Sequence, residues 1–265
     1  MARPVVALLT DFGTADHYVG AMKGVVLTLA PETTLVDITH DVPPHDVLTG
    51  ALELGASYRF FPAGTIFVAV VDPGVGSARR GVAVEAGDYR FVAPDNGVLT
   101  MVLRDLKPKR IVELTERRYA RATVSRTFEG RDRFAPAAAW LAKGVEVNAL
   151  GRPLAAVAQL AVPVPELLPG ELTGEVLRVD RFGNLVTNID RRQFEQFRGS
   201  ANFRIEAGHH GIDQLVATYA DVALGAVCAL FGSSDHLEIA CNGQSAGERL
   251  GLGRGTRVRV LLDKR

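Results

Sequence analysis

Short apolar runs alternate with amphipathic stretches through the first part of the chain. Runs of strand length with many β-branched residues stand at residues 5–9, 34–39 and 66–71. Their length and composition are typical of buried strands. The stretches 16–30 and 46–58 carry apolar residues at helical spacing, and Asp46 is a candidate N-cap for the second. Strand–helix repeats of this kind predict an α/β domain with a mostly parallel sheet.

Polar residues follow the ends of these predicted strands. Asp11 follows the first run, His40 the second and Asp72 the third. Because the carboxyl ends of parallel strands meet at one edge of a sheet, we expect Asp11 and Asp72 on the same rim. A carboxylate at such an edge is a candidate for chemistry, but an aspartate also caps turns through its side chain. Both roles remain open for Asp72 on this argument alone.

Two later segments of the N-terminal half have distinct patterns. Residues 81–85 and 89–93 predict a pair of strands joined by a tight turn. The segment 127–134 is dense in charge and leads into an alanine-rich helix. A charge cluster is usually a solvated face, but Phe128 and Phe134 favour a loop that is at least partly buried here.

The composition changes between Gly151 and Pro169, where four prolines occur and helical spacing is weak. We interpret this segment as a linker, so the chain divides into a domain at 1–150, a linker at 151–169 and a domain at 170–265. Short runs separated by glycine turns follow at residues 171–179, 184–189, 201–206, 227–231, 237–240 and 256–262. They predict a small all-β, barrel-like C-terminal domain that needs a packing partner.

Charge and cysteine content exclude several classes of function. The 30 basic and 30 acidic side chains cancel, so the chain has no electrostatic signature of a nucleic-acid or anionic-membrane partner. No apolar run approaches the ~20 residues of a membrane span, and the N-terminus leads into a strand and not a signal peptide. The two cysteines, Cys228 and Cys241, lie in apolar segments and suit a reducing cytoplasm.

Metal and dinucleotide sites are not favoured by the local motifs. His40–Asp41 and His45–Asp46 have ligand-type residues, but prolines separate them and no matching cluster follows, so capping and surface roles are preferred. Gly74 and Gly76 lack the third glycine and the following helix of a dinucleotide fingerprint. We therefore expect neither a metal site nor a nicotinamide dinucleotide site.

Four motifs in a fixed order carry a family resemblance. They are Thr10–Gly13, Asp72–Gly76 followed by Arg79 and Arg80, Ala93–Gly97, and Asp180–Ile189. Together they resemble the S-adenosylmethionine (SAM) hydroxide adenosyltransferases, which are adenosyl-forming SAM hydrolases related to the fluorinase and chlorinase. The resemblance covers essentially the whole chain. It implies that water attacks the 5′ carbon of SAM to give adenosine and L-methionine, without a cofactor. It also implies a homotrimer that holds substrate between the N-terminal domain of one subunit and the C-terminal domain of the next.

Matched positions imply roles in substrate binding. Asp11, beside Phe12, matches the acid that accepts hydrogen bonds from both ribose hydroxyls, because a carboxylate has two acceptor oxygens. Asp180 matches the acid that holds the methionine ammonium. Phe182 and Asn184 match positions that pack on adenine and hydrogen-bond to it.

Two further positions match less closely. Ser233 stands where the family contacts the methionine end, and Asn242 where it contacts the purine. The neighbouring Ser234 and Cys241 replace arginines of the halogenases, and His45 stands at a position near adenine.

The catalytic set departs from the family pattern at one position. The family places an Asp-Arg-His set around the attacking water, and Asp72 and Arg79 match its first two members. Glu129 stands in place of the histidine in Thr-Phe-His-Gly-Arg-Asp. Two carboxylates near one guanidinium should raise the pKa of one carboxyl, and which one acts as base remains open. Arg131 and Asp132 of the same motif are expected to form a structural ion pair.

Two alternatives to a hydrolase follow from the same residues. The protein could bind SAM without turning it over, as a sensor or buffer, with Glu129 marking lost catalysis. A SAM-dependent halogenase is disfavoured because Asp72 would place a negative charge beside the halide, and because Gly130 replaces a serine of the fluorinase.

Overall fold

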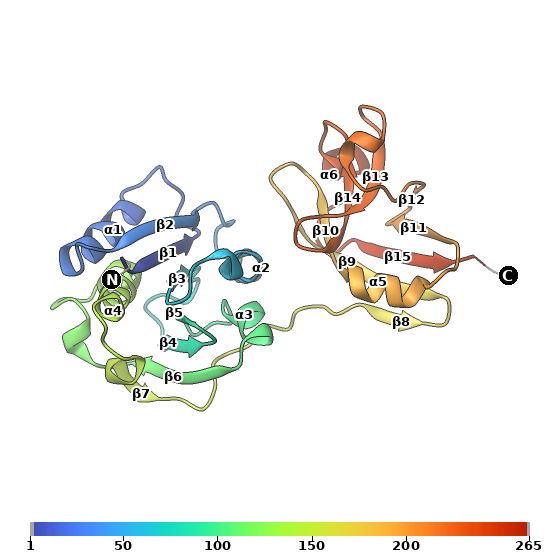
Figure 1. Ribbon diagram of the computed structural model, residues 1–265. Coiled ribbons are helices and arrows are strands. Elements are labelled where there is room, and N and C mark those ends of the chain that lie inside the picture. The colour runs from blue at the N-terminus through green and yellow to red at the C-terminus, as the bar shows by residue number, and fades with distance from the viewer. Residues whose placement is uncertain (1–2, 264–265) are drawn as a thin grey trace. The chain divides into compact units, whose positions relative to one another are not determined.

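The computed structural model describes residues 3–263. The chain forms two compact units, Met1–Ala161 and Val162–Arg265 (Figure 1). The division falls inside the segment 151–169 that the sequence analysis treats as a linker. Both ends of that segment are strands, because β7 (Gly151–Pro153) pairs within the first unit and β8 (Glu166–Leu168) within the second.

A seven-stranded sheet in the order β2-β1-β3-β5-β4-β6-β7 forms the centre of the N-terminal unit. Its other strands are β1 (Val5–Thr10), β2 (Thr34–Thr39), β3 (Ile66–Val70), β4 (Gly81–Ala86), β5 (Tyr89–Pro94) and β6 (Pro108–Leu114). Strands β2, β1, β3 and β5 pair in parallel, and the pairs β5–β4, β4–β6 and β6–β7 are antiparallel. The α/β class is confirmed, and the sheet is mixed, with its parallel half around β1 and β3.

Helices cover both faces of this sheet (Figure 1). They are α1 (Tyr18–Leu29), α2 (Val47–Ser57), α3 (Thr100–Asp105) and α4 (Ala135–Ala142). Alternate residues of a strand point to opposite faces, so Ile66 and Val68 of β3 pack with α1 and α4 while Phe67 and Ala69 pack with α2 and α3. This two-sided burial explains the unbroken apolar run of β3. The predicted N-cap of α2 is present, because the Asp46 side chain accepts a hydrogen bond from the Thr49 amide.

The C-terminal unit is an antiparallel sheet in the order β12-β11-β15-β9-β10-β14-β13, with β8 paired to β9. Its strands are β9 (Glu171–Val179), β10 (Leu185–Asp190), β11 (Phe203–Ala207), β12 (His210–Ile212), β13 (Val227–Phe231), β14 (His236–Cys241) and β15 (Arg257–Leu262). The end strands β12 and β13 contact each other, so the sheet nearly closes into the expected barrel.

Two short helices, α5 (Arg191–Arg198) and α6 (Ala246–Leu250), correct the expectation of an all-β unit. Each begins at a side-chain cap. The Asp190 carboxylate accepts from the Gln193 amide, and the Ser245 hydroxyl accepts from the Glu248 amide. These caps are readable in the sequence, whereas the helices are too short for their apolar spacing to stand out.

Candidate active site

A pocket of about 300 Å³ opens at the carboxyl ends of β1 and β3. Because β1 and β3 pair in parallel, Asp11 and Asp72 enter it from adjacent strands. The segment before α4 adds a second side. The residues that line the pocket include Asp11, Phe12, Tyr18, His45, Asp72, Thr127, Phe128, Glu129 and Gly130.

Arg79 bridges two carboxylates at this pocket. Its Nη2 donates to Asp72 Oδ2 at 2.6 Å and also to Glu129 Oε2. The three side chains are almost fully buried, with exposed fractions of 8% for Arg79, 5% for Asp72 and 10% for Glu129. The structure thus brings together the three residues that the sequence analysis named as catalytic, with the Arg79 guanidinium between the two buried carboxylates.

One oxygen of Asp72 has no partner within residues 3–263. Asp72 Oδ1 is buried and makes no hydrogen bond, as is also true of Arg79 Nε. Burial raises the pKa of Asp72, the Arg79 charge opposes this rise, and the Glu129 charge adds to it. Asp72 therefore offers an unused acceptor with more than ordinary basicity.

Gly76 fixes the turn that carries Arg79 back toward Asp72. Its φ is +78°, and a Cβ atom there would lie 2.5 Å from the carbonyl oxygen of Arg126. Gly74 is less constrained, because the nearest atom to a Cβ there would be the Ser77 hydroxyl at 3.5 Å. Of the two glycines in this turn, only Gly76 is required by both its backbone conformation and its surroundings.

Glu129 directly precedes a π-helical turn, Gly130–Phe134, that leads into α4. Turns of this kind are frequent at functional sites. A Cβ atom at Gly130 would lie 3.1 Å from the Met22 sulfur, so close packing leaves little room for a side chain. The second oxygen of Glu129 lies 3.4 Å from Nη1 of Arg133, one turn further along.

Asp132 has a structural role, as the sequence analysis expected for its pair with Arg131. Its buried carboxylate accepts from Arg131 Nε at 2.7 Å and from the Ser125 amide at 2.9 Å, and it pairs with Arg121 at 3.1 Å. Burial alone would raise the pKa of Asp132, but these hydrogen bonds and charges hold it below its usual value. The carboxylate ties the loop before Thr127 to the π-helical turn.

An aromatic cluster forms one wall of the pocket. The rings of Phe12, Tyr18 and Phe128 meet edge to face, with centroids 5.1–6.1 Å apart. Sequence analysis did not single out Tyr18, whose only signal is its place at the start of the helix after Asp11. The backbone of His45 has a φ of +68°, and its amide donates to Asp11 Oδ2 at 2.8 Å.

The Ala93–Gly97 motif forms hydrogen bonds with the residue that follows β3 and with two other segments. Asp95 accepts from Arg80 Nε at 2.8 Å and from the Ala158 amide at 2.7 Å, and the Asn96 side chain donates to the Val71 carbonyl at 2.7 Å. Arg79 and Arg80 therefore point to different partners. Of the two, only Arg79 contacts the carboxylates that line the pocket, Asp72 and Glu129.

The loop 180–184 of the C-terminal unit borders a separate pocket of about 420 Å³, lined in part by Asp180 and Phe182. Asp180 Oδ1 accepts from the amides of Phe182 and Asn184, at 2.9 and 2.8 Å, and Oδ2 accepts from the Asn184 side chain at 3.0 Å. Phe182 is 78% exposed. Gly183 has a φ of +86° and packs so closely on Ser245 that no Cβ atom would fit. The loop is thus held rigid around an exposed ring.

Ser233 and Asn242 line neither of these two pockets. Ser233 is exposed in the turn before β14, and the Asn242 side chain donates to the Val222 carbonyl at 2.8 Å.

The sequence analysis did not single out Glu238, a buried carboxylate of β14 that is only 6% exposed. Burial and the charge of Asp180 raise the pKa of Glu238.

Neither a metal cluster nor a membrane-spanning helix is found in the part of the chain that the structure describes. No group of three or more His, Cys, Asp or Glu side chains there is arranged to hold a metal ion. None of its helices is both long and apolar enough to cross a membrane.

The fold and the pocket together define a two-domain protein with a buried carboxylate–guanidinium–carboxylate site at the edge of parallel strands. Residues 6–151 match the SAM hydroxide adenosyltransferase N-terminal domain, and residues 174–259 match the C-terminal domain of the same family. The chain belongs to the SAM hydroxide adenosyltransferase family, which confirms the resemblance of its motifs.

Individual relatives agree with this membership. A protein named (R)-S-adenosyl-L-methionine hydrolase from Salinispora tropica is 40% identical over 97% of both chains. A fluorinase from Actinoplanes sp. is 33% identical over 73% of this chain and 74% of its own. The crystal structure of an uncharacterized conserved protein from Thermotoga maritima superposes with a TM-score of 0.91 at 34% identity, over 97% of this chain and 99% of that one.

Proposed function

We propose that this protein hydrolyses S-adenosyl-L-methionine to adenosine and L-methionine. Its family and its 40% identity to a protein named for that activity support the reaction class. The observation that carries the proposal is the unpartnered, buried Asp72 Oδ1 beside Arg79, in a pocket lined by aromatic rings. This oxygen is placed to accept a hydrogen bond from an attacking water.

The chemistry needs an aligned nucleophile and little else. The water oxygen forms a bond to the 5′ carbon while the carbon–sulfur bond breaks, and the bonding electron pair leaves with sulfur as a neutral thioether. A proton passes from the water to Asp72 and then to solvent. Alignment of the water opposite the leaving sulfur can contribute several kcal/mol, on the order of the gains known for oriented reactants.

The two flanking groups orient Asp72. Arg79 fixes one carboxylate oxygen and leaves the other free, while burial and the negative charge of Glu129 keep Asp72 basic next to this guanidinium. In this proposal Asp72 is the base and Glu129 takes the place of the family histidine as a positioning group.

Substrate binding uses the remaining matched positions. Asp11 binds the ribose hydroxyls, with the Phe12 ring beside it. In the C-terminal unit, Asp180 holds the ammonium group and Phe182 and Asn184 receive adenine, with Ser233 and Asn242 as weaker assignments. The working form is a homotrimer in which these two sets of residues come from different subunits. The buried, unpaired Cys228 and Cys241 suit the reducing cytoplasm, where we place the activity.

Formation of adenosine by the purified protein tests this function. Adenosine that appears with SAM alone, and fails to appear with D72A, supports hydrolysis. Binding of SAM without any product would instead identify a sensor or buffer. A product whose formation requires chloride or fluoride would identify a halogenase, which the buried negative charge of Asp72 disfavours.

The reaction is expected to need no cofactor. A sulfonium leaves as a neutral thioether, so neither a Lewis acid nor a proton donor is needed at sulfur. Dialysis against EDTA should therefore leave the rate unchanged. A rate that falls and returns on addition of a divalent metal would contradict this mechanism.

A further inference from the structure

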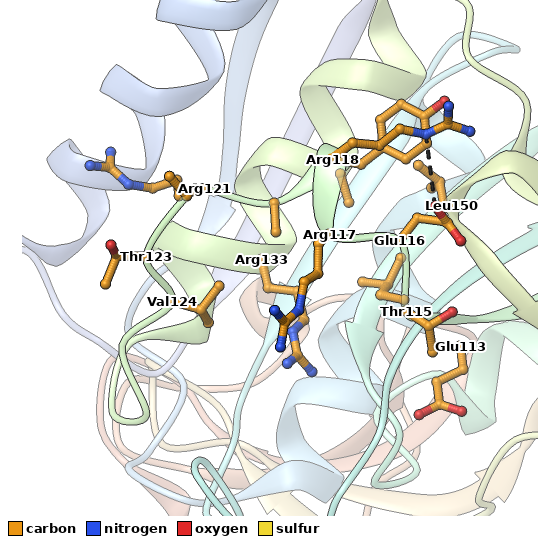
Figure 2. A pocket seen from close by; sticks show the side chains of 15 residues that line it. Glu113, Thr115, Glu116, Arg117, Arg118, Arg121, Thr123, Val124, Arg133 and Leu150 are labelled. Atoms are coloured by element: carbon orange, nitrogen blue, oxygen red, sulfur yellow. Dashed lines mark ion pairs between the residues drawn. The ribbon is translucent and has the colours of Figure 1, made fainter.

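A second pocket of the N-terminal unit, of about 800 Å³, has a wall rich in arginine (Figure 2). It shares no lining residue with the proposed active-site pocket. Its lining comes from the end of β6, the segment 115–124, the π-helical turn and α4. The arginines that line it are Arg117, Arg118, Arg121 and Arg133.

Most of the charges around this pocket are already paired. Glu113 pairs with Arg152 at 2.9 Å. Glu116 lies 3.8 Å from Arg118, the pair marked by the dashed line in Figure 2. Arg121 pairs with the buried Asp132 at 3.1 Å. The acids that line the pocket therefore leave Arg117 without a partner, and Arg133 pairs only outside this lining.

Arg117 supplies this uncompensated charge, and Arg133 adds a charge whose partner, Glu129, is shared with Arg79. Arg117 has no ion pair within residues 3–263, and the only one of Arg133 is its 3.4 Å contact with Glu129. Figure 2 shows both guanidinium groups pointing in the same direction from different elements. Two like charges that converge in a pocket repel each other unless an anion lies between them. The chain as a whole has no net charge, so this is a local concentration of positive charge.

We infer that this pocket binds a phosphate-bearing anion, with the guanidinium groups of Arg117 and Arg133 as its main contacts. Arginine presents a planar fork of donors that matches phosphate oxygens, and such charge-assisted hydrogen bonds are stronger than neutral ones. The hydroxyl groups of Thr115 and Thr123 add polar atoms to the lining. The volume accommodates a diphosphate or a larger phosphorylated metabolite.

Arg133 connects this pocket to the proposed active site. It lines the anion pocket and lies 3.4 Å from one oxygen of Glu129, whose other oxygen binds Arg79. A bound anion would neutralise Arg133 or draw it away from Glu129. Loss of a nearby positive charge raises the pKa of a carboxyl group. The acid limb of the pH–activity profile, where the rate falls with decreasing pH, would therefore move to higher pH. This second consequence rests on the proposed function, whereas binding does not.

Calorimetric titration of the full-length protein with pyrophosphate tests the binding site. We expect saturable binding that weakens at least tenfold in R117Q and in R133Q. R59Q is the matched control, because Arg59 is an exposed arginine paired with Asp105 and lies outside the pocket. Thermal unfolding of each variant checks that it is folded. Absence of saturable binding, or equal weakening in all three variants, would overturn the site.

The link to the active site has its own readout. With pyrophosphate present, the acid limb of hydrolysis should shift upward in the wild type and stay in place in R133Q. R117Q should keep wild-type hydrolysis without pyrophosphate and should lose the shift. If the acid limb of the pH–activity profile does not move while calorimetry still shows pyrophosphate binding, the coupling to the active site is rejected and the anion-binding site stands. If no adenosine forms at all, the calorimetric result still stands on its own.

Discussion

At the scale of single residues, the environment of Asp72 is unfavourable for stability but favourable for action as a base. Its carboxylate is buried, one oxygen is held by Arg79, and the other has no partner among the described residues. Burial and Glu129 raise the pKa of Asp72 against the opposing charge of Arg79. A raised pKa in the folded state means that the ionised form costs stability above that pKa, because the unfolded chain ionises more easily.

Replacement of this charge should separate activity from stability. D72N should lose on the order of 10²–10⁴-fold in kcat, the range typical of a general base. Its free energy of unfolding at pH 7 should be unchanged or higher, because a neutral amide removes the buried charge and leaves Arg79 paired with Glu129. Adenosine release and urea unfolding measure the two effects. Large losses in both would show that Asp72 mainly holds the fold.

The pH dependence of hydrolysis reports the same group. Deprotonated Asp72 is the active form, so kcat/KM should fall with decreasing pH through a pKa above the ordinary 3.8. E129Q removes the like charge that raises this pKa, so its acid limb should move to lower pH and its turnover should change. An unmoved limb and untouched turnover in E129Q would exclude the positioning role of Glu129.

Sequence alone named the members of this site but not their contacts. The family pattern pointed to Asp72, Arg79 and Glu129, and the structure brings the three together. The family pattern did not indicate which carboxylate would keep a free oxygen, because that depends on the direction of the Arg79 side chain. Tyr18 was missed because it lines the pocket through tertiary packing and not through a motif. Arg133 was missed although its contact with Glu129 spans only four residues of the chain.

At the scale of elements, the ends of β1 and β3 and the turn after Asp72 position the site. The unbroken apolar run of β3 was predictable because both of its faces are buried. The strand pair β4–β5 followed from a short turn between two β-rich runs. Helices α5 and α6 were not predicted, because they are too short for their apolar residues to show a helical spacing. Only their N-terminal caps are readable in the sequence.

The turn after Asp72 gives a matched pair of substitutions. G76A forces a positive φ on alanine and a contact of 2.5 Å with the Arg126 carbonyl, so it should destabilise by about 1–3 kcal/mol and reduce activity. G74A meets its nearest atom at 3.5 Å and should cost less than G76A. Chemical unfolding compares the two. Equal effects would mean that this turn tolerates more movement than its packing suggests.

At the scale of the whole molecule, the two units carry different parts of the proposed site. The N-terminal unit holds the reacting groups, and the C-terminal unit holds the loop around Asp180 with the exposed Phe182. The division into an α/β unit and a barrel-like unit was predictable from the change of pattern along the chain. The assembly was not, because the sequence of one chain does not show which surfaces meet.

Mixing of inactive subunits tests the proposed trimer. D72A and D180A should each be inactive alone, and co-expressed subunits should recover part of the activity, because some sites then combine two intact halves. Light scattering should give a mass of three times 28.4 kDa. A monomeric mass, or mixtures as inactive as the single variants, would contradict a site shared between subunits.

Hydrolysis in water enriched in ¹⁸O tests the role of the aligned water most directly. Mass spectrometry of the products should find one ¹⁸O atom in adenosine and none in methionine, and the labelled product should be lost in D72N. Adenosine without label, label in methionine, or unchanged formation of labelled adenosine by D72N would contradict attack on the 5′ carbon by a water held at Asp72.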